Sequence, residues 1–583
     1  MKGIEKVRAG EQLNSAATAF SAKIIFRTTA LVAVLAVMSI SVFTGCEPDE
    51  SNTYIVPTER WPGQPQPAIQ FSGLSISQND SAIDKIKQAA EKDEPLYLWL
   101  RGDQKQPVSF DNIYDLDTTG LVLNKGSTSP AEVTIDGNSK TIPLKGGNPA
   151  GAPLITVGKD VTLTLRNITF NGVEVENNKA PLIKVENGGT LVLAAGAVIT
   201  GNTNKLDSAG VGGGAGGVIV EGGGTLIMNG GTISKNVGTG NGGGAYVATG
   251  GTFTMDNGTI SDNKTTGDSS SGGGVYVAGE GIFTTNGGTI SGNTAQTTGG
   301  GVTVDGSFTM TGGTIGENKA QITGGGGVNV NGGEFTMISG IIEKNEAEGN
   351  GHGGGVYMSN GTFSMISGTI RENTANTGGG VQINGGAFSI SGTSGIINNI
   401  AEKFGGGVYI EDSSFDMTGS VKITGNTVTE ENGNGGGVYV NSNGVFTMEN
   451  GSISGNGIYP NEGYTEDPPK GFGAGVFVDA SGMFSKTGGT IHGLIQEYPS
   501  YDESQYGYEN VELQNYYAEK HEEGVIANVT IAEIASGYAV YYHKDDGFWR
   551  DMTAGPGRNL STANTDLGGW NDSQNEGDEP NEE

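Results

Sequence analysis

The chain of 583 residues has a single cysteine, Cys46, which excludes a disulfide-stapled fold and a zinc site built from cysteines. Proline is also scarce, at 18 residues, whereas glycine is abundant, at 104. A collagen triple helix needs glycine at every third position with much proline, so that class is excluded. Flexible glycine linkers lack the regularly placed Val, Ile, Phe and Met of this chain. Glycine therefore punctuates a repeat here.

Basic residues are few. Lys and Arg number 32 against 64 Asp and Glu, which gives a formal net charge of -32. An acidic surface repels phosphate backbones, so we expect no nucleic-acid partner.

The N-terminal segment is predicted to direct export. Basic residues between Lys2 and Arg27 precede an apolar run over 30–42, which is too short for a comfortable membrane span but suits a signal peptide. The run ends in Phe43-Thr44-Gly45-Cys46, which resembles the lipobox of bacterial lipoproteins, with Phe43 in place of the usual leucine. The resemblance implies that Cys46 is lipidated and anchors the chain to a membrane. The alternative is a buried core thiol. We predict a signal peptide over 1–46 and a flexible, polar tether over 47–70.

An internal repeat dominates the rest of the chain. The segment Gly272 to Val277, Gly-Gly-Gly-Val-Tyr-Val, recurs at 353–358, 405–410 and 435–440, with looser copies between. Each copy precedes a Phe-x-Met-like stretch and then Gly-Thr-Ile-x-x-Asn, with a period of roughly 27 residues. Only the segment between the Asn and the next Gly run varies much in length. Short strands forming a coil of fixed size, with one turn free to grow, explain this pattern.

Alternation within the repeat gives the side-chain directions. In Val275-Tyr276-Val277 the two valines point one way and Tyr276 the other. Such strands have no local partner, so they pair with the next coil, and stacking buries a continuous apolar ladder. We predict an all-β, right-handed, single-stranded parallel β-helix over 131–500, with about 12 rungs and a length of roughly 60 Å.

An asparagine follows the Ile of each repeat by three residues. Asn tolerates left-handed turns, and stacked Asn side chains hydrogen-bond along the axis. We therefore predict an internal Asn ladder, with ligand binding as the alternative. Its members are Asn202, Asn236, Asn263, Asn293, Asn318, Asn345, Asn373, Asn399, Asn426 and Asn456.

Both ends of the stack need covers. Residues 71–130 are predicted to form an N-terminal cap with an amphipathic helix from Ser81 to Lys92 and a strand from Leu96 to Leu100. Residues 501–570 are predicted to add C-terminal rungs and a cap, with strands at 529–534 and 538–542. Residues 571–583 read as an acidic, disordered tail.

The repeat resembles the right-handed β-helices of the pectin-lyase-like superfamily, and it is similar to adhesin-like surface lipoproteins and polymorphic outer-membrane proteins of bacteria. The elements that carry the resemblance are the paired Gly-Gly-Val and Ile-x-x-Asn motifs over roughly residues 130–500. The resemblance implies a fold, whereas function has to be argued from a site.

No catalytic constellation, metal site or cofactor is predicted. Hydrolysis of glycosidic bonds requires two converging carboxylates. Gly351-His352-Gly353 matches one hydrolase motif of the superfamily, but the other motifs are out of order. Glu317, Lys344 and Glu372 occupy equivalent positions in successive coils and alternate in sign, as do Lys319 and Glu346, which favours cross-coil ion pairs. Arg101-Gly102-Asp103 is read as a turn, with an integrin-like ligand as the alternative.

Aromatic residues recur at the outward position of the Gly-rich strand. They form a candidate binding face, because exposed rings stack on sugars or anchor partners. The alternative is that tyrosine simply suits a strand. The candidates are Tyr246, Tyr276, Tyr357, Tyr409, Tyr439 and Phe477.

The sequence therefore predicts a non-catalytic, lipid-anchored protein of the bacterial cell envelope, at the outer membrane or cell surface. Its β-helix would serve adhesion, with glycans or surface proteins of host or neighbouring cells as candidate partners. The alternative is a carbohydrate-active enzyme, a polysaccharide lyase or hydrolase, or a carbohydrate-binding protein on the same fold.

Overall fold

The computed structural model describes residues 153–172, 178–205, 214–430, 433–458, 475–479 and 482–493, together with strands outside these ranges. The predicted lipidation site Cys46, the helix over 81–92, the turn at 101–103 and the tail over 571–583 lie outside the described residues.

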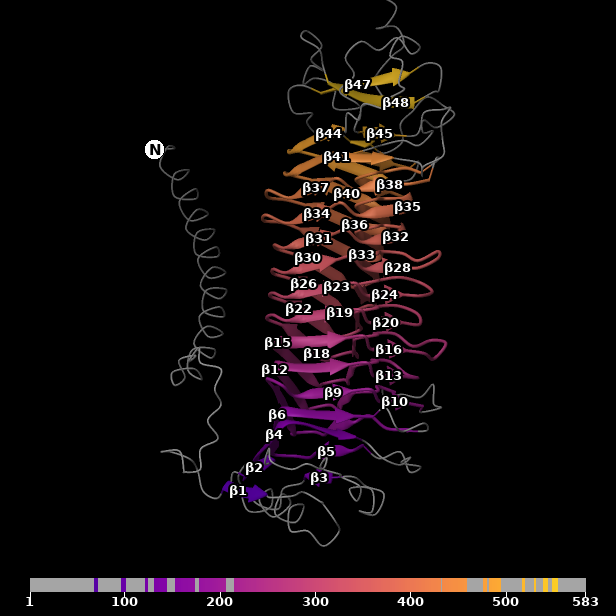
Figure 1. The fold of residues 1–583 in the computed structure, drawn as a ribbon. Coiled ribbons are helices and arrows are strands. Elements are labelled where there is room, and N and C mark those ends of the chain that lie inside the picture. The colour runs from indigo at the N-terminus through magenta and orange to yellow at the C-terminus, as the bar shows by residue number, and fades with distance from the viewer. Residues whose placement is uncertain are drawn as a thin grey trace, which may run out of the picture. The chain divides into compact units, whose positions relative to one another are not determined.

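The described chain is a parallel β-solenoid of about 11 turns, close to the expected 12 (Figure 1). Each strand pairs with the equivalent strand of the next coil. For example, Val275 pairs with Val302, and Val302 pairs with Val328. No helix occurs among the described residues, and none there is long and apolar enough to cross a membrane.

Each coil begins with a Val strand, and from β5 to β42 the middle residue of this strand points outward. These strands are β3 (Leu121–Leu123), β5 (Ile155–Val157), β7 (Ile183–Val185), β11 (Val218–Val220), β14 (Ala245–Val247), β17 (Val275–Val277), β21 (Val302–Val304), β25 (Val328–Val330), β29 (Val356–Ser359), the first parts of β33 (Val381–Ile390) and β36 (Val408–Met417), β39 (Val438–Val440), β42 (Val476–Val478) and β45 (Tyr516–Ala518).

A Phe strand follows in each coil. From β15 to β43, its Phe and the second residue after that Phe, which is usually Met, point inward. The stack consists of β1 (Ala68–Phe71), β2 (Leu96–Leu100), β4 (Ala131–Pro143), β6 (Val161–Asn171), β8 (Thr190–Ala194), β12 (Thr225–Ser234), β15 (Thr252–Ser261), β18 (Ile282–Thr285), β22 (Ser307–Met310), β26 (Glu334–Met337), β30 (Thr362–Met365), the later parts of β33 and β36, β40 (Val445–Met448), β43 (Met483–Lys486) and β46 (Val529–Thr530).

An Ile strand completes the apolar part of the coil. It is formed by the later parts of β4, β6, β12 and β15, and by β9 (Val198–Thr200), β19 (Thr289–Ser291), β23 (Thr314–Gly316), β27 (Ile341–Glu343), β31 (Thr369–Arg371), β34 (Gly395–Ile397), β37 (Lys422–Thr424), β41 (Ser452–Ile458) and β44 (Thr490–Gly493).

Short strands after the asparagine form a second sheet along one corner. They are β10 (Thr203–Asn204), β13 (Val237–Gly238), β16 (Lys264–Thr265), β20 (Thr294–Ala295), β24 (Lys319–Ala320), β28 (Glu346–Ala347), β32 (Thr374–Thr377), β35 (Ile400–Phe404) and β38 (Thr427–Val428).

Parallel pairing extends beyond the range predicted for the repeat. Strand β2 confirms the predicted strand at 96–100 and pairs with β4, while β1 begins at Ala68, within the segment assigned to the tether. At the other end β45 pairs in parallel with β42 and antiparallel with β48 (Phe548–Thr553). Strand β48 also forms an antiparallel hairpin with β47 (Tyr538–His543), so the sheet direction changes where the repeat ends.

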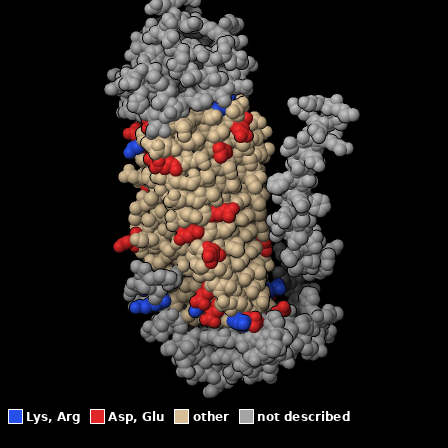
Figure 2. All heavy atoms as spheres, turned by 180° about the vertical axis from the view of Figure 1, so that it is seen from behind, with Lys and Arg blue, Asp and Glu red and all other residues tan. Residues whose placement is uncertain are grey.

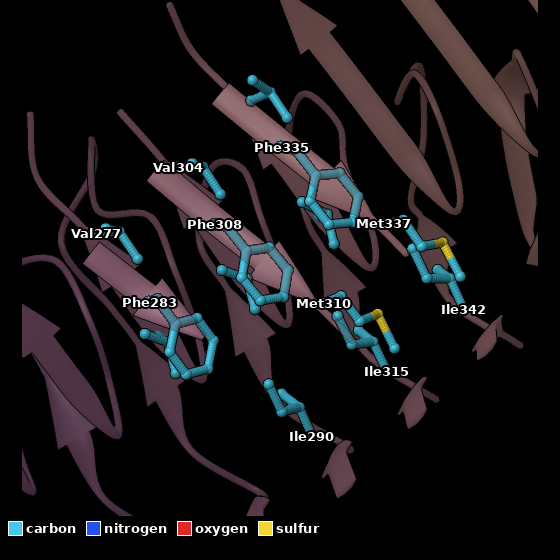
Figure 3. Close-up of a cluster of buried hydrophobic side chains, with 14 of the residues drawn as sticks. Val277, Phe283, Ile290, Val304, Phe308, Met310, Ile315, Phe335, Met337 and Ile342 are labelled. Carbon is cyan, nitrogen blue, oxygen red and sulfur yellow. The ribbon is translucent and has the colours of Figure 1, made fainter. Parts of the chain in front are cut away.

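The core is a set of stacked identical side chains (Figure 3). Phenyl rings of consecutive Phe strands, from Phe253 to Phe484, lie parallel with centroids 4.6–4.9 Å apart. Leu191 and Leu226 hold the same position in earlier coils. These side chains are fully buried, because period-two alternation turns every second residue inward.

Glycine is required where the chain enters the Val strands from β14 to β39. Gly325 has φ 68°, a left-handed conformation that costs side-chain-bearing residues free energy. The next residue, Gly326, lies so close to the neighbouring coil that an added Cβ would lie 2.6 Å from backbone atoms of Glu346. The Gly run is therefore a steric requirement of the coil.

The ten asparagines form a buried ladder of hydrogen bonds. From Asn236 to Asn426, each Nδ2 donates to the Oδ1 of the next asparagine at 2.9–3.1 Å, and each backbone N–H donates to the same oxygen. Each Nδ2 also donates to the carbonyl of an Ile-strand residue, as Asn345 does to Ile315. Asn178, which lacks the Ile-x-x-Asn context, adds a bond to Asn202 at 2.7 Å. The described members make internal bonds, and their exposed fraction is at most 1%.

Candidate functional site

The middle residues of the Val strands form one column on the outside of the solenoid, here called the outer column. From the first described coil it consists of Thr156, Lys184, Ile219, Tyr246, Tyr276, Thr303, Asn329, Tyr357, Gln382, Tyr409, Tyr439 and Phe477. All six aromatic candidates from the sequence lie in this column. The outward direction predicted for them is therefore correct.

The expected exposure of the aromatic face is wrong for its C-terminal half. Tyr409 and Tyr439 are each 7% exposed and Phe477 is 5% exposed. Their rings stack at 5.3 and 5.0 Å, and Phe404, from the end of β35, packs on Tyr439 at 4.9 Å. These rings form a second apolar cluster beside the main core, so they do not offer ring faces to a ligand.

The other three tyrosines are half-buried. Tyr246 and Tyr276 stack at 5.4 Å, and the hydroxyl of Tyr276 donates to the Asp305 carboxylate of the next coil. Burial raises the pKa of Tyr276, and the carboxylate raises it further. Burial likewise raises the pKa of Tyr357. These hydroxyls therefore remain protonated donors at neutral pH.

A row made mostly of carboxylate and amide side chains runs beside the outer column, one residue after the Val strand, and is interrupted at Gly158, Ala248 and Ala278. This polar edge consists of Glu186, Glu221, Asp305, Asn331, Ser359, Asn384, Glu411, Asn441 and Asp479. The polar edge was not predicted from the sequence. The signal that could have found it is the recurrence of Asp, Glu or Asn directly after Val-x-Val.

Glu411, on the polar edge, accepts hydrogen bonds from side-chain amides of both neighbouring coils. Asn384 Nδ2 donates to its Oε2 at 3.1 Å from one neighbouring coil, and Asn441 Nδ2 donates to its Oε1 at 3.0 Å from the other. Asn441 also lies 2.6 Å from the Tyr409 hydroxyl. Burial raises the pKa of Tyr409, and the charge of Glu411 adds to the rise. The amides hold this carboxylate in a fixed orientation.

His352 lies on the opposite side of the outer column, at the end of the variable turn. Its Nδ1 is 2.7 Å from Thr377 Oγ1, which donates to Gln382 Oε1 at 2.5 Å, and its ring is 5.8 Å from that of Tyr357. Because Thr377 uses its proton on Gln382, we assign the proton of the neutral imidazole to Nδ1. Burial lowers the pKa of His352. The residue is a structural link between two coils.

Asn329 has a buried polar atom without a hydrogen bond, unlike the other residues described here in the outer column. It is 3% exposed, and its buried Oδ1 has no hydrogen-bond partner. In the preceding coil, Thr303 Oγ1 donates to the carbonyl of Thr298 at 3.1 Å. Gly324 holds the position equivalent to Thr298 and His352 in the neighbouring coils. Because Gly324 has no side chain, it provides no side-chain donor for the Asn329 oxygen.

The predicted ion pairs between coils are confirmed for Lys319–Glu346 and Lys344–Glu372, whereas Glu317 makes no ion pair with Lys344. Lys319 Nζ lies 2.6 Å from Glu346 and 3.3 Å from Glu348, and Lys344 Nζ lies 3.8 Å from Glu372. Further such pairs are Arg371–Glu343 at 2.6 Å and Lys184–Glu221 at 2.9 Å. These pairs are partly exposed, so each contributes little stability.

The described coils contain no group of three or more His, Cys, Asp or Glu side chains placed to hold a metal ion. Of the motif matches with hydrolases, Gly351-His352-Gly353 lies in a described turn, whereas Asp545-Asp546 and Asn564-Thr565-Asp566 lie outside the described residues.

The chain matches no protein-family model, no curated protein and no solved structure. Its candidate functions therefore rest on the solenoid and on the residues along its outer column.

Proposed function

We propose that this protein is a non-catalytic, lipid-anchored component of the bacterial cell envelope that displays its solenoid for adhesion or surface interaction. The lipobox-like segment ending at Cys46 supports the anchor. The ladders of Asn, Phe and Ile support a rigid display scaffold, because each coil repeats the packing of its neighbours.

The main support for this proposal is that the length of the coils varies in a single turn. The turns between the Val, Phe and Ile strands hardly change from coil to coil, whereas the turn after the short strand does. That turn is brief between β32 and β33 and long between β41 and β42. In repeat proteins, insertions gathered on one face commonly mark the binding face. Loops of varied length on a constant scaffold suit recognition of a partner.

Metabolic labelling tests the anchor. Cells producing the full chain or its Cys46→Ser variant are given an alkyne-tagged fatty acid, and the purified protein is examined for the tag. We expect the tag on the parent alone. Antibody against the solenoid should also stain intact cells that produce the parent. An untagged parent would overturn the anchor, and staining that requires permeabilised cells would overturn surface display.

A carbohydrate-active enzyme is the second candidate, favoured by one arrangement on the polar edge. Glu411 and Asp479 lie two coils apart, with Asn441 between them. Two coils correspond to about 10 Å between main chains. Carboxylates of inverting glycosidases lie about 6.5–9.5 Å apart, so this pair merits a direct test. By contrast, Lys184 contacts both Glu186 and Glu221 and offsets one of the two charges of that closer pair.

Release of reducing or unsaturated sugars from polysaccharides distinguishes the two candidates. The non-catalytic proposal predicts no release by the parent. Release that disappears in both Glu411→Gln and Asp479→Asn, with the fold retained, would establish the enzyme instead.

A further inference from the structure

The outer face of the Phe strands differs from the other faces in its low charge. Residues on either side of each Phe, and after each Met, form three rows over nine coils from β15 to β43. The row between Phe and Met is almost entirely hydroxyl-bearing: Thr254, Thr284, Thr309, Thr336, Ser364, Ser389, Asp416, Thr447 and Ser485. We call these three rows the hydroxyl face.

The hydroxyl face also collects exposed apolar side chains. The described residues include six large hydrophobic side chains that are exposed, and four of them lie here: Ile282 (48%), Ile338 (42%), Ile366 (48%) and Met483 (44%). Ile338 and Ile366 follow the paired Met337 and Met365, so they are neighbours on adjacent coils. Exposed apolar groups gathered on one flat sheet indicate an interaction surface.

Charges are rare on this face. Its charged members are acidic, namely Asp256, Glu334, Asp416 and Glu449, and from Ile282 to Ser391 the rows hold Glu334 alone. The inter-coil ion pairs Lys319–Glu346 and Arg371–Glu343 involve other strands of the coil. Figure 2 shows carboxylates separated by broad uncharged areas on one side of the coils. Because the chain carries a net charge of -32, an uncharged face is where two copies could approach with least repulsion.

We propose that the hydroxyl face is the interface of a dimer formed with a second copy of this chain. Nine coils spaced by about 4.8 Å, each presenting a strand of five residues, give a face of roughly 700 Å² per copy. Stable interfaces bury about 800 Å² per partner. A second copy also presents rows with the same spacing, so small Thr and Ser side chains can interdigitate as two sheets pack about 10 Å apart.

Sedimentation velocity tests this interface. The full chain carrying Cys46→Ser, which cannot be lipidated, is compared with the same chain carrying Ile338→Lys and Ile366→Lys. The matched control carries Ile322→Lys and Ile400→Lys, two exposed isoleucines outside the face. We expect the parent and the control to be dimeric, and the Ile338/Ile366 variant to raise the dissociation constant about tenfold or more. Both variants change the net charge equally, so general repulsion cannot explain a difference.

The dependence of the dissociation constant on salt is a second test of the dimer interface. Screening of two strongly acidic copies should lower the dissociation constant as NaCl is added, whereas an interface of ion pairs would weaken. Ser364 is the middle member of the hydroxyl row. Ser364→Cys on the Cys46→Ser background should therefore form a covalent dimer under mild oxidation. Ile322→Cys serves as the control.

A monomeric parent would overturn the proposal, and so would equal loss of dimer in both lysine variants. A monomer that binds polysaccharide through Ile338 and Ile366 would assign the face to a glycan instead. The lipid-labelling experiment does not depend on any of these results.

Discussion

At the scale of single residues, the buried asparagine ladder links the coils most directly. Asn345 donates to Ile315 and Asn373, and it accepts two bonds from Asn318. A buried polar group that loses its partner costs about 1–3 kcal/mol, and several groups lose theirs together here. We therefore expect Asn345→Ala to lower the free energy of unfolding by about 2–4 kcal/mol.

Urea unfolding of the full chain measures this loss. Asn331→Ala is the control, because Asn331 is exposed and bonds only on the surface, where a change of about 0.5 kcal/mol or less is expected. Equal midpoints for the two variants would contradict a structural ladder.

Asn329 gives a prediction of opposite sign. Its buried oxygen lacks a donor, whereas Thr303 in the preceding coil bonds to a main-chain carbonyl. Asn329→Thr removes the unpaired amide oxygen, and its hydroxyl can donate to the carbonyl of Gly324 as Thr303 donates to that of Thr298. We expect the variant to be more stable than the parent by about 1 kcal/mol in thermal unfolding. A lower melting temperature would show that the Asn329 amide has a partner in solution.

At the scale of elements, the Phe strands determine how tightly the coils stack. Phe335 lies between Phe308 and Phe363 at 4.8 and 4.7 Å. Phe335→Ala should cost about 3–5 kcal/mol, because it leaves a cavity and breaks the ring stack. Phe335→Leu should cost much less, since Leu191 and Leu226 hold the same position in earlier coils. Unfolding midpoints of the two variants test this difference, and similar losses would contradict it.

The same elements show what sequence could predict. The strands, their inward residues and the Asn ladder follow from a periodic pattern, in which each coil repeats the side-chain directions of the last. Burial of Tyr409, Tyr439 and Phe477 was missed because it depends on Phe404, in the part of the coil that varies in length. The polar edge was missed because alternating Asp, Glu and Asn were not read as equivalent positions. Carboxylates were expected only in ion pairs between coils, such as those that Glu346 forms with Lys319 and Glu372 forms with Lys344.

At the scale of the whole molecule, the solenoid should tolerate loss of a complete coil. Val302 and Val328 hold equivalent positions, so removal of residues 302–327 joins Gly301 to Val328 in register. Stability of such arrays is nearly a sum over repeats and their neighbours, so the shortened chain should fold with a slightly smaller urea m-value. Removal of 302–314, which ends inside a coil, should prevent cooperative unfolding. If both shortened chains unfolded with equal cooperativity in urea, stability would not depend on keeping complete coils, which would contradict this prediction.

Binding without turnover is the central claim at this scale. The full chain carrying Cys46→Ser is applied to an array of glycans and extracellular-matrix proteins, and sugar release is assayed in the same samples. We expect that at least one glycan or matrix protein binds the chain, that shortening the segment between β41 and β42 weakens this binding, and that no sugar is released. Sugar release, above all if it requires Glu411 and Asp479, would contradict the account and identify an enzyme.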